Sequence, residues 1–272
     1  METNLKFGAL LLIGLLFAGA IVPLVAAQGL REENREARQR YAQARGDFAQ
    51  MSGEYQDARE NLIEARQRYG LRHQATVEAA GNFMDKAIGV TISHLERMRA
   101  FVESDWALEA ADKERIISEI DVEIAWLEAK QAEVEGATRE ELVEIGKTVQ
   151  DRWRNQIRVN LKDYTGQILN ARAQWLLEEA DKAIVVAEQE TERARNAGKD
   201  VTEAEALIED AKAKRDLAEA EYNKAKNSFG QINSLQDADR LFREGYAFIK
   251  EGNRYILDAY QDLKRINSEL RN

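Results

Sequence analysis

Residues 28–272 contain no proline, because the only proline of the chain, Pro23, lies near the N-terminus. Proline fixes φ, removes a backbone donor and normally interrupts helices or marks turns. Apolar residues recur at helical spacing through this proline-free region. The sequence therefore predicts an all-α fold, an elongated antiparallel long-helix bundle or coiled-coil hairpins, with five to six helices after an N-terminal apolar segment.

The N-terminal apolar segment covers residues 7–27, which carry no charge and are followed at once by the charged run REENRE. Its VAA ending suits signal-peptidase cleavage before Gln28, whereas its 21 residues also suffice to span a bilayer. We therefore expect residues 1–27 to be a signal peptide or an N-terminal membrane anchor. The chain should be exported, to the extracellular space or the cell surface, and could associate with the membrane through residues 7–27.

Composition excludes several classes of function. With no Cys and two His, the chain cannot use thiol chemistry, disulfides or the usual Cys/His zinc sites. The net charge of −10 argues against sequence-independent nucleic-acid binding. Neither a dinucleotide-binding glycine fingerprint nor a P-loop is present, and His73 and His94 lack the spacing of metal-ligand pairs. We expect no cofactor, no metal, no nucleic acid and no small-molecule substrate, and we nominate no catalytic residue.

A heptad pattern of large residues follows the apolar segment, and we call it the aromatic seam. Small or flexible residues stand three positions after most of its members, which allows a second helix to approach closely. The hexapeptide EARQRY also occurs twice, 28 residues or four heptads apart. The pattern predicts a helix that packs against a partner helix, either in the same chain or in a second copy. The aromatic seam consists of Tyr41, Phe48, Tyr55, Leu62 and Tyr69.

Glycines and capping residues divide the rest of the chain into helices. After Gly70 we expect a helix from about residue 72 to 103, and then an acidic helix that Ser104 and Asp105 cap and Gly136 ends. The capping-box pattern at 138–141 should open a helix without interruption up to Gly198, about 90 Å long. A tight turn at 196–200, a returning helix and a last helix after a polar break at 230–236 complete the prediction.

These elements suggest two regions, a helical coiled-coil region at 28–136 and a long helical hairpin plus C-terminal helix at 137–272. In the last helix, Gly245 and Gly252 lie seven positions apart, which favours close approach to a neighbouring backbone. Trp106, Trp126, Trp153 and Trp175 fall on apolar stripes, which is more typical of core residues than of a ligand cleft.

Charge is unevenly distributed along the chain. Residues 103–144 hold 14 acidic and 4 basic residues, whereas a basic patch follows immediately. Arg154, Arg158 and Lys162 should share one face of a regular helix. The basic patch could neutralise the acidic helix if the two pack antiparallel, or it could contact anionic lipid head groups. The basic patch consists of Lys147, Arg152, Arg154, Arg158 and Lys162.

The stretch from Ala194 to Lys226 resembles helical hairpins of exported, often archaeal, cell-surface proteins of undefined activity. In these, a turn of the form Gly-x-Asp-Val-Ser/Thr-Glu-Ala-Glu opens an Ala/Glu-rich helix. The resemblance covers about an eighth of the chain and implies a surface location without implying an activity. The matching residues are Gly198, Asp200, Val201, Thr202, Glu203, Ala204 and Glu205.

Together these features predict an exported, non-enzymatic helical protein with a structural or interaction role at the cell surface. Its partner would be another protein or a second copy, bound through helices. The alternative is a holdase-like or membrane-associated remodelling protein with an amphipathic lipid-facing stripe. A third class, a hydrolase with two carboxylates, has no segment in the sequence that points to a substrate groove.

Overall fold

The computed structural model of the protein describes residues 35–269, so the apolar segment at 7–27 lies outside the described residues. In this part of the chain the structure is helical throughout and contains no strand, which confirms the all-α prediction. The elements are α2 (Arg35–Tyr69), α3 (Gln74–Ser104), α4 (Ala110–Ala132), α5 (Arg139–Arg152), η1 (Trp153–Ile157), α6 (Arg158–Asn196), α7 (Thr202–Gly230) and α8 (Leu235–Glu269).

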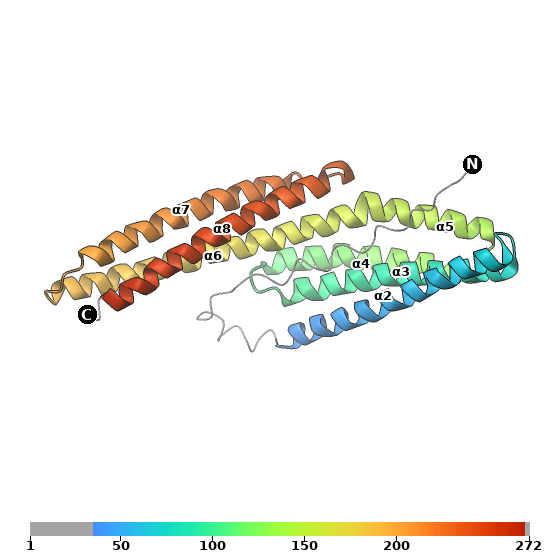
Figure 1. Cartoon of the computed structure of the whole chain (residues 1–272), viewed down its shortest axis with the longest axis horizontal. Coiled ribbons are helices and arrows are strands. Elements are labelled where there is room, and N and C mark those ends of the chain that lie inside the picture. Colours follow the sequence, from blue (N-terminus) through green and yellow to red (C-terminus); the bar gives the residue numbers. More distant parts are fainter. Residues whose placement is uncertain (1–34, 270–272) are drawn as a thin grey trace.

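One long helical rod, formed by α5, η1 and α6, runs the length of the elongated molecule (Figure 1). At 1.5 Å per residue this rod is about 85 Å long. The helices α3 and α4 pack along its N-terminal half, with α2 packed on α3, and α7 and α8 pack along its C-terminal half (Figure 1). The protein therefore consists of two helical bundles that share one long rod.

The prediction of an uninterrupted α-helix after residue 138 is wrong at one place. A turn of π-helix, η1, separates α5 from α6. The π-helix makes i→i+5 hydrogen bonds and inserts an extra residue into the turn. Since neither glycine nor proline occurs in WRNQI, the sequence carries no local sign of this turn.

The predicted helix boundaries depend on three glycines that the structure places in turns. Gly70, Gly136 and Gly198 have φ of 81°, 72° and 79°, which is the left-handed region that favours glycine. The predicted capping box is also present, since Thr138 and Glu141 exchange both of its hydrogen bonds. Three of the four tight connections therefore follow from local chemistry.

The fourth connection differs from the prediction, because Asp105 does not cap the acidic helix. Its carboxylate accepts hydrogen bonds from the amides of Ala107 and Leu108 in the turn after α3. The helix α4 begins at Ala110 with Glu109 as its N-cap, and Glu109 makes no side-chain cap hydrogen bond. In this extra turn Trp106 lies edge-on to Trp175, with ring centroids 4.2 Å apart.

The N-terminal bundle has a core of large side chains drawn from α3, α4, α5, η1 and the first part of α6. Buried members from beyond residue 137 include Leu142, Ile145 and Ile168. The boundary expected at residue 136 therefore coincides with a turn but does not divide this core.

The C-terminal bundle is packed through small residues, as the spacing of Gly245 and Gly252 predicts. A Cβ atom on Gly245 would lie 2.6 Å from the Phe229 ring, and one on Gly252 would collide with the ring of Tyr222. Gly166 of α6 meets Phe229 from the other side, where a Cβ would lie 2.7 Å away. Phe229 thus fills a slot between two glycines on different helices.

Candidate functional site

The aromatic seam lies against α3 of the same chain. Three of its residues pack on aromatic rings of α3, each with a centroid distance of 5.4 Å: Tyr41 on Phe101, Phe48 on His94 and Tyr55 on Phe83. Tyr55 is buried and Leu62 is half-buried, whereas Tyr69 at the end of α2 is 44% exposed and stacks on His73. The partner helix of the seam is therefore α3.

His94 lies at the centre of this contact between helices. It is buried between Phe48 and Trp153, and its Nδ1 atom lies 3.0 Å from a guanidinium nitrogen of Arg97. Burial, together with the positive charge of Arg97, lowers the pKa of His94 to about 4. At neutral pH the imidazole is uncharged and serves as a packing group.

The structure divides the basic patch among several partners. Arg152 forms a bidentate pair with the buried Glu123 of α4, at 2.7 and 3.2 Å. Arg158 and Lys162 both reach Asp239 of α8. One basic residue thus neutralises the acidic helix, and two join the rod to the C-terminal bundle.

The other two basic residues stay on the surface. Lys147 pairs with Glu144 of its own helix, and Arg154 is exposed. Arg154 lies in η1 and does not share the partner of Arg158 and Lys162, which both pair with Asp239. These five side chains do not form a single basic surface.

The four tryptophans are half-buried at the margin of the N-terminal core, in agreement with the packing interpretation. Trp126 and Trp153 pack directly on the core cluster, and the Arg152 guanidinium lies 4.6 Å from the centre of the Trp126 ring. None of the four rings lines the groove described below.

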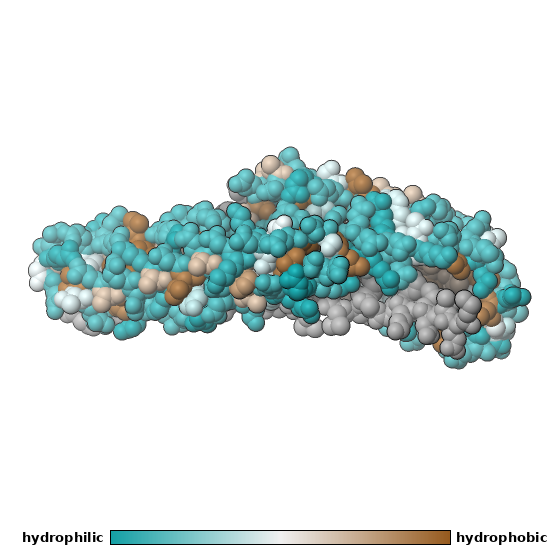
Figure 2. Space-filling model, turned by 90° about the horizontal axis from the view of Figure 1, so that it is seen from above, coloured by the Kyte–Doolittle hydropathy of each residue, from teal (hydrophilic) through white to brown (hydrophobic). Residues whose placement is uncertain are grey.

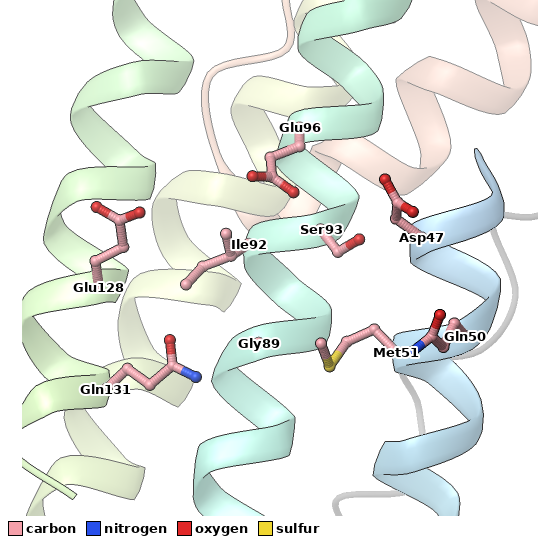
Figure 3. Close-up of a pocket in the computed structure, with 9 residues that line it drawn as sticks. All are labelled: Asp47, Gln50, Met51, Gly89, Ile92, Ser93, Glu96, Glu128 and Gln131. Atoms are coloured by element: carbon pink, nitrogen blue, oxygen red, sulfur yellow. The ribbon is translucent and has the colours of Figure 1, made fainter. Parts of the chain in front are cut away.

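A groove between α2, α3 and α4 is the strongest candidate for a binding site (Figure 3). It has a volume of about 390 Å³. At its floor Met51 packs closely on Gly89, where a Cβ would lie 3.2 Å from the sulfur of Met51. The lining residues are Asp47, Gln50 and Met51 of α2, Gly89, Ile92, Ser93 and Glu96 of α3, and Glu128 and Gln131 of α4.

The groove is acidic, and its charges are not balanced. Asp47, Glu96 and Glu128 come from three different helices, and within residues 35–269 none of them makes an ion pair or a hydrogen bond (Figure 3). Burial raises the pKa of Glu96, and the negative charges of Asp47 and Glu128 raise it further against the opposing effect of Arg99. The mutual repulsion of these carboxylates would be relieved by a cation.

Sequence reasoning missed this groove. Its acidic residues lie between 32 and 81 positions apart along the chain, and they share no motif. Only the packing of three helices brings them together, and the sequence alone did not specify the relative rotation of these helices. Gly89 is the one local signal, because a glycine inside an apolar helix often marks a close contact or an opening.

The face of the molecule seen in Figure 2 is mostly hydrophilic, with apolar residues in small scattered groups. Along residues 35–269, no helix has the length and apolar character needed to cross a bilayer. The same residues contain no cluster of three or more acidic or histidine side chains arranged to hold a metal ion.

Comparisons with protein-family models, with curated proteins and with solved structures found no match for this chain.

Proposed function

We propose that this protein is an exported, non-enzymatic helical module of the cell surface, which holds a protein partner through its N-terminal bundle. In this proposal the apolar segment at 7–27 directs export. The rod formed by α5, η1 and α6 then connects the binding groove with the C-terminal bundle, which serves as a stiff support.

The observation that carries this proposal is the use of buried charges to join helices. Asp105 is fully buried, and its Oδ2 atom accepts from two guanidinium nitrogens of Arg172 of α6, at 2.7 and 2.8 Å. Glu123 and Arg152 join α4 to α5 through a bidentate pair. Reactive chemistry requires polar groups that remain available to a substrate, whereas these are committed to helix packing.

The membrane-remodelling alternative receives less support. It requires a basic or amphipathic face free to meet lipid. Three of the five residues in the basic patch form ion pairs with other helices, and a fourth pairs within its own helix. Because most of the basic patch is held in ion pairs within the chain, the surface is better suited to binding a protein than a membrane.

Fractionation of cells that produce the native chain tests export. We expect the protein either in the soluble extracellular fraction, with an intact mass that begins at Gln28, or in the membrane fraction at full length. Recovery of the full-length chain from the soluble cytoplasm would contradict the proposal.

A second measurement tests the interaction role. In a gentle native extract, the protein should elute in size-exclusion chromatography as a larger species than the purified chain alone. Addition of the purified chain to an extract from cells that lack it should restore this species. If native and purified protein elute at the same volume in both experiments, the interaction role is wrong.

A further inference from the structure

We propose that the groove between α2, α3 and α4 binds an organic cation, a primary ammonium or guanidinium group on an aliphatic stem, supplied by a basic side chain of a partner polypeptide. This inference rests on the proposed function for one point, that the cation is supplied by a protein partner. The affinity of the groove for such a group is a property of the purified chain.

The first argument is the charge of the groove. Asp47, Glu96 and Glu128 approach it from three sides without a cationic partner in the described chain. Neighbouring acidic residues on the same helices are paired: Glu103 with Arg40 and Arg99, and Asp121 with Arg99. The groove thus brings together three carboxylates that make no ion pair, and a bound cation would interact favourably with all three.

The second argument is Ser93, which is only 5% exposed and lines the groove. Its hydroxyl oxygen is not fully enclosed and makes no hydrogen bond to another group of residues 35–269, so it remains open to a group in the groove. Figure 3 shows this side chain on the α2-facing side of α3, on the same side as Asp47. The hydroxyl oxygen can accept a hydrogen bond from an ammonium or guanidinium group that enters the groove.

The third argument is the mixed character of the walls. Ile92 and Met51 provide apolar surface between the carboxylates, and Gly89 lets the Met51 side chain lie close against α3. Lysine and arginine bury their methylene stems along apolar surface while the charged head stays among polar groups. A long basic side chain matches this combination of apolar floor and acidic rim.

The spacing of the three carboxylates in the groove does not suit a metal ion. Metal ligands must converge to within a few ångströms of one point, and the described residues contain no group of three acidic or histidine side chains placed in that way. An ammonium group on a flexible stem can interact with separated carboxylates in turn. The separation of the three carboxylates therefore favours an elongated organic cation.

The test uses the purified chain and heteronuclear NMR at low salt, where charge interactions are least screened. The probe is the acetylated and amidated peptide Lys-Ala-Lys, compared with the same peptide acetylated on both ε-amines and with spermidine. We expect saturable shifts at the backbone amides of Gly89 and Ser93 and at the Gln131 side chain with Lys-Ala-Lys. The ε-acetylated peptide should cause none, because it keeps the stem and lacks the charge.

Matched variants separate the groove from general charge attraction. The pair Glu96→Gln and Glu128→Gln should weaken binding of Lys-Ala-Lys about tenfold or more, since each loses a charge-assisted contact. The control pair Glu114→Gln and Glu135→Gln removes the same charge at exposed positions outside the groove and should leave the affinity within twofold. Ser93→Ala should weaken binding about threefold without changing the unfolding midpoint.

Three results would overturn the inference. These are absence of saturable shifts, equal loss of affinity in both pairs of variants, and equal shifts with the ε-acetylated peptide. Tighter binding of spermidine than of Lys-Ala-Lys would assign the groove to a free polyamine and overturn the polypeptide source. If Lys-Ala-Lys binds the groove but fractionation finds the chain in the cytoplasm, the groove still binds a cation and the exported role is wrong.

Discussion

The two bundles share one rod but are packed by opposite means. The largest core cluster of the N-terminal bundle contains no alanine among its buried members, whereas the two clusters of the C-terminal bundle contain nine. Small residues allow helices to approach closely and leave little space between them. The largest core of the N-terminal bundle is therefore built from large side chains, and the cores of the C-terminal bundle rely on close approach of helices.

The bundles also differ in how they use buried polar groups. In the N-terminal bundle, Asp105, Glu123 and His94 are buried and each contacts another helix. In the C-terminal bundle, Asp262 is the buried acid, paired with Lys214. Packing of helices in the N-terminal bundle therefore relies more on buried charged and polar groups. Packing in the C-terminal bundle relies more on the close fit of side chains.

The largest effect should come from removing a buried partner in the N-terminal bundle. Asp105→Ala leaves the Arg172 guanidinium without its carboxylate and two turn amides without their acceptor. We expect the free energy of unfolding to fall by about 4 kcal/mol. Chemical denaturation followed by circular dichroism measures this change.

The matched control for Asp105→Ala is Asp181→Ala, which removes the half-exposed partner of Arg215 in the C-terminal bundle. An exposed ion pair contributes less than about 1 kcal/mol. Equal losses in the two variants would contradict the difference between the bundles.

Acidification should destabilise the N-terminal bundle through His94. Its pKa is about 4 in the folded state, below the ordinary value of 6.5, so the unfolded chain takes up a proton that the folded chain does not. The contribution of His94 to the free energy of unfolding is therefore fully present above pH 6.5. It falls by about 3 kcal/mol as the pH decreases towards 4. The measurement is the free energy of unfolding from pH 7 to pH 4.5.

The variant His94→Gln isolates this effect from the titration of carboxylates. Its stability should depend less steeply on pH than that of the wild type between pH 6.5 and 4.5. Parallel pH profiles for the two proteins would show that His94 is not held uncharged by burial.

The C-terminal bundle should be sensitive to added volume. In Gly252→Ala the new methyl group would collide with the Tyr222 ring, whose hydroxyl is fixed by a 2.7 Å hydrogen bond to Asn253. We expect a loss of about 2 kcal/mol, measured by chemical denaturation. Gly53→Ala has open space around the new methyl group and should instead stabilise α2 by up to about 1 kcal/mol. A gain in stability in both variants would disprove close packing at Gly252.

A substitution in the aromatic seam should not change the molecular mass of the protein in solution. Because Phe48 packs on His94 and Arg97 of the same chain, Phe48→Ser should leave the mass measured by light scattering unchanged. A fall from a dimer in the wild type to a monomer in the variant would show that the aromatic seam joins two copies.

The sequence predicted the features that depend on local chemistry. The glycine turns at 70, 136 and 198, the capping box at Thr138 and the close approach at Gly245 and Gly252 each follow from the residues present. The π-helical turn η1 could not be predicted, because it contains no residue that breaks a helix.

Features that depend on the rotation of packed helices relative to one another could not be predicted from the sequence. The pair between Asp105 and Arg172 joins residues 67 positions apart, and the slot for Phe229 requires Gly166 and Gly245 to lie opposite each other. The groove is a feature of the same kind, because its three carboxylates lie on three helices. Periodicity identifies the buried face of a helix but not which residues it meets.

The central claim is that the two bundles are built on one continuous rod, and a distance across η1 tests it most directly. The natural chain has no cysteine, so Glu144→Cys and Glu178→Cys give specific sites for spin labels on the exposed surfaces of α5 and α6. Pulsed electron resonance should give a single narrow distribution near 50 Å, as a continuous helix requires. A broad distribution, or a main distance well below 50 Å, would show that the rod bends at η1 and that the bundles are independent bodies.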